Sequence, residues 1–184
     1  WEEFCDWYRE MVKPRLYSEE SGTKEAALWT LQTVLMYALK LLHPFMPFVT
    51  EEIYTTLQPY CSSEYPEESI MISVWPEYTE DMNFKESEEE IELIKEAVRG
   101  IRNGRAEMNV PLGKKAKVFV VSGNEAIRET FAKGEEYLIT LAKATSLTIQ
   151  ADMEGIGEDA LSVPLSGVTV YIPLEDLVDI STEI

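Results

Sequence analysis

The sequence is poor in the residues from which metal sites and many catalytic sites are built. Its 184 residues include one histidine, His43, and two cysteines, Cys5 and Cys61. A structural zinc site takes four Cys or His ligands, so these residues cannot supply one. The two cysteines lie far apart without CxxC spacing, which favours free thiols in a reducing, cytoplasmic setting over a disulfide. We therefore predict no metal site.

Motifs of catalysis and nucleotide binding are also missing. None of the patterns GxGxxG, GxxxxGK[ST] and GxSxG occurs. His43 lies between an apolar segment and two prolines, where we expect it to close a helix terminus. Acidic residues such as Glu88 and Glu90 lie in polar stretches typical of a solvated surface. The sequence therefore predicts no catalytic residue in this chain.

No apolar run is long enough to cross a membrane. The nearest candidate, residues 28–42, is interrupted by four polar residues, whereas a spanning helix needs about 20 mostly apolar residues. The opening letters, WEEFCDWY, contain no Met and no signal-peptide pattern. They are typical of the inside of a helix, so we expect a piece of a longer protein without membrane association.

Helical periodicity dominates the first part of the sequence. Apolar residues recur at spacings of three and four over 1–12, 23–42 and 86–108. The middle segment is apolar almost all round, and such a helix is typical of the centre of a bundle. Its narrow polar stripe consists of Thr30, Thr33, Tyr37 and Lys40. We therefore predict a mainly α chain in which residues 1–110 form an antiparallel helical bundle.

The last predicted helix, 86–108, separates apolar from basic residues. We expect its apolar face to pack on the bundle, with Gly104 marking a close approach of another helix. The cations of the opposite arc, expected to face solvent, are Lys95, Arg99, Arg102 and Arg105.

Beyond this helix the pattern becomes that of strands. Strand-like stretches occur at 117–121 and 146–151, with two helical segments between them. A hairpin signal, Ser166-Gly167, joins two further apolar stretches. The sequence therefore predicts a small α+β domain over 111–184.

One segment is strongly basic in an otherwise acidic chain. From Arg99 to Lys117 there are six cations and one anion, a net charge of +5 against −18 for the whole chain. Such a segment favours contact with phosphate, although isolated cations on a helix are more often simply solvated. Both interpretations remain open here. The candidate RNA-binding residues are Arg99, Arg102, Asn103, Arg105, Asn109, Lys114, Lys115 and Lys117.

RNA binding also needs surfaces on which unpaired bases stack, and exposed aromatic rings supply them. Trp29, Phe45 and Phe84 are the candidates for base stacking. Aromatic residues in apolar segments are more often part of a core, so for these residues too the structural interpretation stands beside the functional one.

Three motifs, in this order and spacing, resemble the C-terminal part of the valyl-tRNA synthetase family, which is a class I aminoacyl-tRNA synthetase family. They are FCDWYREMVKPRL at 4–16, LLHPFMPFVTEEIY at 41–54 and VRGIRNGRAEMNVPLGKK at 98–115. The middle motif is shared with the isoleucyl and leucyl families, and the other two are specific to the valyl family. The later stretch LSVPLSGVTVYIPLEDLVDI resembles the segment before the C-terminal coiled coil of that family.

The resemblance implies that 1–110 is the anticodon-binding bundle without its first helix, and that 111–184 connects it to a coiled-coil arm. The parent enzyme would be a valine–tRNA ligase that uses ATP and Mg²⁺. The partners implied are valine tRNA and the catalytic domain, editing domain and coiled-coil arm of the same chain. No cofactor is expected in this part. Two alternatives remain: the same region of an isoleucyl-tRNA synthetase, and a helical protein–protein interaction module.

Overall fold

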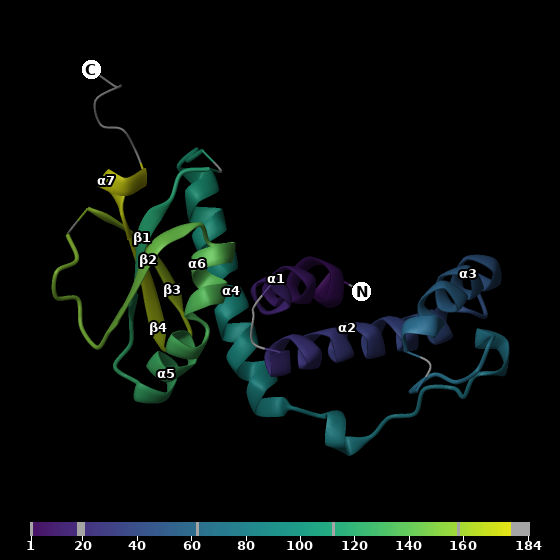
Figure 1. Cartoon of the computed structure of the whole chain (residues 1–184). Helices are drawn as coiled ribbons and strands as arrows, with labels where there is room; N and C mark the ends of the chain where they lie inside the picture. Colours follow the sequence, from purple (N-terminus) through teal and green to yellow (C-terminus); the bar gives the residue numbers. More distant parts are fainter. Residues whose placement is uncertain (1, 18–20, 62, 112, 158, 178–184) are drawn as a thin grey trace. The chain divides into compact units, whose positions relative to one another are not determined.

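A computed structural model describes residues 2–17, 21–61, 63–111, 113–157 and 159–177. The chain divides into two units, residues 1–83 and 84–184. Helices predominate, and one small mixed sheet follows them, which confirms the predicted combination of a helical part and an α+β part (Figure 1). The helix predicted over 1–12 starts at a residue that lies outside the described ranges.

The first unit is built around one long helix. Helix α2 packs against both of its helical neighbours, as expected for a central helix. It ends at Leu42, just before His43-Pro44, because the residue before a proline avoids the helical conformation. The elements are η1 (Glu3–Tyr8), α1 (Arg9–Tyr17), α2 (Ser21–Leu42), α3 (Pro47–Leu57), η2 (Gln58–Tyr60), η3 (Ile70–Ile72) and η4 (Glu80–Met82).

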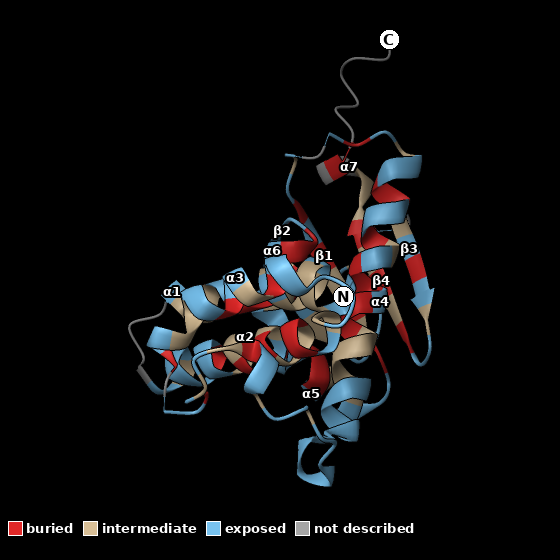
Figure 2. Ribbon diagram, turned by 90° about the vertical axis from the view of Figure 1, so that its right-hand side faces the viewer, coloured by how far each residue is buried: buried red, intermediate tan, exposed pale blue. Residues whose placement is uncertain are grey.

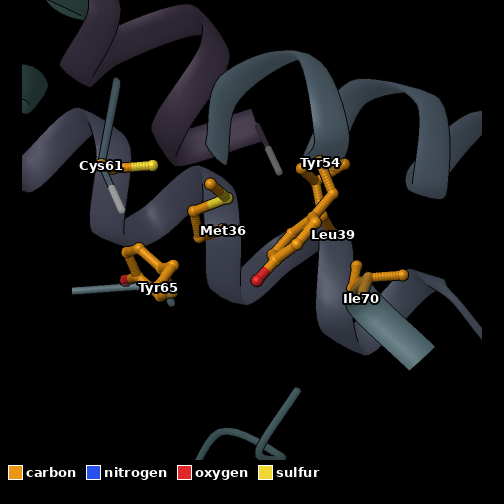
Figure 3. Packing of buried hydrophobic residues seen from close by; sticks show 6 residues of the cluster. All are labelled: Met36, Leu39, Tyr54, Cys61, Tyr65 and Ile70. Atoms are coloured by element: carbon orange, nitrogen blue, oxygen red, sulfur yellow. The ribbon is translucent and has the colours of Figure 1, made fainter. Parts of the chain in front are cut away.

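A cluster of buried side chains holds the segment after α3 onto α2 and α3 (Figure 3). Met36 and Leu39 come from α2, and Tyr54, which is fully buried, comes from α3. The Tyr54 hydroxyl donates a hydrogen bond to the carbonyl oxygen of Glu67 at 3.1 Å. This irregular segment therefore has a fixed place on the two helices. The remaining members of the cluster are Cys61, Tyr65 and Ile70.

The second unit contains a four-stranded sheet in the order β2-β1-β4-β3. Strands β1 and β2 are parallel and are connected through α5 and α6, whereas β4 is antiparallel to both β1 and β3. The predicted hairpin is confirmed, and Gly167 at its turn has a φ of 76°. The elements are α4 (Lys85–Glu107), β1 (Ala116–Val121), α5 (Glu125–Lys133), α6 (Glu135–Leu141), β2 (Ala144–Gln150), β3 (Ala160–Leu165), β4 (Val168–Pro173) and α7 (Leu174–Leu177).

Helix α4 packs within the second unit, against β3, α5 and α6 (Figure 2). We expected the apolar face of α4 to pack on the bundle, and this prediction was wrong, because the face packs against elements of the second unit. Gly104 does mark a close approach, but of a strand: a Cβ there would lie 2.7 Å from Leu161 Cδ2 on β3. Periodicity shows which face of a helix is buried and not what covers it. The predicted functional extent of the first domain, 1–110, stays a prediction.

Candidate nucleic-acid interface

Arg105, in the last turn of α4, is buried instead of facing solvent, with 7% of its surface exposed. Its guanidinium donates hydrogen bonds to the carbonyl oxygens of Ala142 at 3.0 Å and Lys143 at 3.4 Å, and to that of Lys114. Burial lowers the pKa of this guanidinium below its ordinary value. Arg105 therefore joins the end of α4 to the α6–β2 turn and to the segment before β1.

Arg102 lies one turn earlier on α4 and is exposed. Its Nε and Nη2 both donate to the carbonyl oxygen of Leu141, at 3.1 and 2.9 Å. This carbonyl belongs to the C-terminal end of α6, where helical carbonyl groups lack partners within the helix. Two predicted RNA-binding cations thus also stabilise the fold, because they satisfy the acceptors at the end of α6.

The two preceding cations of the arc share one carboxylate. Glu92 accepts hydrogen bonds from Lys95 at 2.5 Å and from Arg99 at 2.7 Å. These two bonds lower the pKa of the Glu92 carboxyl from its ordinary 4.5, and the bond from Lys95 has the largest effect. Lys95 is buried, so its expected exposure was wrong, whereas Arg99 is exposed. The arc that periodicity assigned to solvent is therefore exposed at only part of its positions.

A cavity of about 440 Å³ lies in the first unit along the predicted polar stripe of α2. Trp29 and Trp75 line it and are 47% and 55% exposed. Three members of the polar stripe, Thr33, Tyr37 and Lys40, also line it, so the stripe that the sequence singled out borders a cavity. The volume lies within the about 300–1,000 Å³ typical of small-ligand sites.

Among the described residues that line this cavity, Lys40 is the only cation, although it is itself buried. Its Nζ donates to the carbonyl oxygen of Val74 at 3.0 Å and lies 5.1 Å from the centre of the Tyr65 ring. Burial lowers the pKa of its amine from the ordinary 10.5. Three carboxylate side chains also line the cavity, which makes it unsuited to a phosphate: Glu64, Glu67 and Glu77.

The other predicted stacking residues are exposed as well. Phe45, in the turn between α2 and α3, is 82% exposed, and Phe84, at the start of the second unit, is 67% exposed. The structural interpretation, in which these aromatic rings are core residues, does not hold for them. Neither ring lines the cavity beside Trp29. Trp75, which lines that cavity, is not among the three base-stacking candidates predicted from the sequence.

A second cavity, of about 610 Å³, lies in the second unit between the end of α4 and the α6–β2 turn. It brings together three predicted RNA-binding residues and one lysine, Lys143, that the sequence did not single out as a site residue. Lys143 is exposed and has a φ of 56°. No pattern within the sequence links it to α4, because the link is tertiary. The lining residues are Arg102, Asn103, Arg105, Ala106, Val110, Leu141, Ala142 and Lys143.

The remaining predicted residues follow the end of α4. Asn109 is exposed and has a φ of 53°, as expected of a residue that terminates a helix. Lys115 and Lys117 are exposed, and Lys114 is half-buried. The Lys114 carbonyl accepts a hydrogen bond from Arg105, which ties this segment to the wall of the second cavity. The predicted cluster is thus partly assembled: three of its eight members line one cavity, and the other five are not among the lining residues.

The side chain of His43 lies at the junction of α2 and α3. His43 Nδ1 lies 2.7 Å from Thr50 Oγ1, and the Thr50 hydroxyl donates to the Met46 carbonyl, so His43 closes the junction of α2 and α3 as expected. Within the described ranges, no group of His, Cys, Asp or Glu side chains has the arrangement of a metal site. Among those same residues, no helix combines the length and apolar character that a membrane span requires.

Comparison with known families identifies the class of this domain. Residues 1–120 match the family described as the anticodon-binding domain of tRNA ligase. The chain belongs to this family.

Curated relatives of the chain include valine–tRNA ligases, which confirms the resemblance read from the three motifs. The chain is 45% identical over 184 residues to the valine–tRNA ligase of Clostridium perfringens and 44% identical to that of Clostridium acetobutylicum. It is 37% identical over 183 residues to the enzyme of Bacillus cereus. All of this chain is covered in each comparison, and it spans 20% of the length of each relative.

Proposed function

We propose that this chain is the anticodon-recognition part of a cytoplasmic valine–tRNA ligase, and that its partner is valine tRNA. The parent enzyme would attach valine to this tRNA in a reaction that uses ATP and Mg²⁺. We propose no catalytic role in this reaction for the residues that line the two cavities. Residues 1–110 would act as an anticodon-binding bundle of the class I synthetase type, and 111–184 would connect it to a coiled-coil arm. The observation that carries the proposal is the cavity lined by Trp29 and Trp75.

The chemistry of this cavity favours an unpaired base over a phosphate. Two partly exposed indole rings offer the flat apolar surfaces on which a base stacks. The carboxylates of the lining repel phosphate, whereas they accept hydrogen bonds from the exocyclic amino groups of bases. The phosphates of the same RNA would be met by the predicted cations of residues 99–117. This division of roles follows from the sign of the charge in each unit's cavity.

The exposed apolar residues also suit the alternative of a protein–protein interaction module. Replacing Trp29 and Phe48 separately by Ala distinguishes the two. Phe48 is 90% exposed in the same unit but does not line the cavity. Loss of one stacked base costs about 1–3 kcal/mol. Trp29→Ala should therefore weaken binding of valine tRNA by about 5- to 150-fold in an anisotropy titration, and Phe48→Ala should leave it unchanged.

Two outcomes would count against the proposal. Failure of the unaltered chain to bind valine tRNA would leave the interaction module as the better interpretation. Equal affinities for valine tRNA in the Trp29→Ala and Phe48→Ala variants would remove the cavity from the binding site. The isoleucyl alternative is less favoured because the curated relatives are valine–tRNA ligases. Tighter binding of isoleucine tRNA than of valine tRNA would favour the isoleucyl alternative.

A further inference from the structure

We infer that the cavity between the end of α4 and the α6–β2 turn is a phosphodiester-binding site, and that Lys143 is the residue that contacts the phosphate. The inference rests on the proposed function and deepens it, since it places an RNA backbone contact in the second unit. It also adds a residue outside the basic segment 99–117. The site is formed only when α4 and the α6–β2 turn come together.

The charge of the lining supports an anionic ligand. Arg102, Arg105 and Lys143 are cations, Asn103 offers a neutral amide, and none of the described residues that line the cavity carries a carboxylate side chain. This contrasts with the net charge of −18 for the chain. The ligand class that matches three cations without a carboxylate is a phosphate, and in an RNA-binding protein that phosphate belongs to the backbone.

The end of α6 would oppose an anion if its carbonyl groups were bare. A helix C-terminus carries a partial charge of about −0.5. Here the carbonyl of Leu141 accepts from Arg102, and those of Ala142 and Lys143 accept from Arg105. Two full positive charges therefore outweigh the partial negative charge, and the third cation, Lys143, adds to the balance.

Lys143 occupies a backbone position that would suit glycine better. Its φ of 56° lies in the left-handed region, two residues after the end of α6, where Gly is the usual residue. A lysine here adds an exposed cationic residue to the lining of the cavity at some conformational cost. Arg105 holds both this turn and the Lys114 carbonyl, so the lysines of the two segments stay near the same cavity.

The left-handed backbone makes Lys143→Gly an informative variant, because it removes the charge and suits the backbone. The matched control is Lys133→Gln, which removes one exposed charge from the same unit, on α5, where Lys133 pairs with Glu90 at 2.9 Å. Each variant of the full chain is titrated with a fluorescent 12-nucleotide oligouridine over a series of KCl concentrations. This probe has a phosphate backbone and no anticodon.

We expect Lys143→Gly to unfold no more easily than the parent chain and to bind oligouridine about 5- to 10-fold more weakly at low salt. Its plot of log affinity against log salt should be less steep by about 0.7 for each phosphate that the variant no longer neutralises. Lys133→Gln should match the parent chain in its affinity for oligouridine and in its salt slope. Equal effects of the two variants, or an unchanged salt slope in Lys143→Gly, would overturn the site.

Chemical acetylation locates the phosphate independently. Oligouridine should protect Lys143 from acetylation and leave Lys133 reactive, and equal protection of both would overturn the site. Because the probe lacks an anticodon, this result is separate from the test of Trp29. Oligouridine binding without preference for valine tRNA would refute the proposed function alone. Preference for valine tRNA with an unaffected Lys143→Gly variant would refute the phosphate site alone.

Discussion

Replacing Arg105 by Ala should destabilise the second unit by about 2–4 kcal/mol. The buried guanidinium donates to the carbonyl oxygens of Lys114, Ala142 and Lys143. A hydrogen bond from a charged group contributes about 1.5–3 kcal/mol, and a buried acceptor left unpaired adds a cost of its own. Three such bonds would exceed 4 kcal/mol if they were additive. The adjoining cavity, however, gives water access to the freed carbonyls, and contributions within one network are not additive.

Two other variants calibrate this magnitude. Arg102→Ala removes an exposed guanidinium whose described bonds go to a single carbonyl, that of Leu141, and should cost no more than about 1.5 kcal/mol. Arg105→Lys keeps the charge but loses the planar group that reaches three acceptors, so its loss should fall between the two Ala variants. The order of the three losses tests the role assigned to the guanidinium.

Urea denaturation can follow the two units separately. All four tryptophans, at positions 1, 7, 29 and 75, precede the second unit, so their fluorescence reports on the first. Hydrogen exchange of the β1 and β4 amides reports on the second, and far-UV circular dichroism follows the helices of both units. Arg105→Ala should lower the second transition and leave the fluorescence transition in place. A loss no larger than that of Arg102→Ala, or a shift seen only in fluorescence, would refute the reasoning.

Two further predictions concern a glycine and a thiol. Gly100→Ala, whose new Cβ would meet Val163 Cγ1, should destabilise the second unit by about 1–3 kcal/mol. Val163→Ala should reduce that loss, and Gly22→Ala, which has open space around it, should instead stabilise the first unit by up to about 1 kcal/mol; both are checked by the same urea titrations. Cys61 is buried and donates to the Leu57 carbonyl at 3.2 Å, so a thiol reagent should modify the half-buried Cys5 first. Burial raises the pKa of the Cys61 thiol above 9.0, so the unfolded chain ionises first and stability should fall as the pH rises above 9, an effect that Cys61→Ala removes. Equal reactivity of both thiols, or the same pH dependence in Cys61→Ala, would contradict this assignment.

The features that follow from local pattern were predictable from the sequence. The central position of α2 and the hairpin between β3 and β4 follow from periodicity and turn chemistry, and the family follows from three motifs. The polar stripe of α2 could also be read from the sequence, and its members Thr33, Tyr37 and Lys40 line a cavity, although Thr33 and Lys40 are themselves buried. Each of these features is determined by residues close together in the chain.

The features that depend on distant residues were not predictable in the same way. Helical spacing placed Arg105 on a basic arc, but its burial depends on carbonyl acceptors that residues 114, 142 and 143 supply. Lys143 stands alone in the sequence and joins Arg102 only through the packing of α4 beside α6. The partner of α4 was missed for a similar reason, since an apolar stripe fits a strand as well as a helix.

The affinity of this chain for valine tRNA, compared with its affinity for the same tRNA carrying a different anticodon, tests anticodon recognition most directly. The two RNAs have the same backbone charge, so the cations of the second unit contribute equally to both. We predict that valine tRNA binds at least about tenfold more tightly, which corresponds to about 1.4 kcal/mol and lies within the about 1–3 kcal/mol by which hydrogen bonds to base edges discriminate against a wrong base. Transfer of the valine anticodon into isoleucine tRNA should restore the tighter binding. Equal affinity for all of these tRNAs would contradict anticodon recognition by this chain.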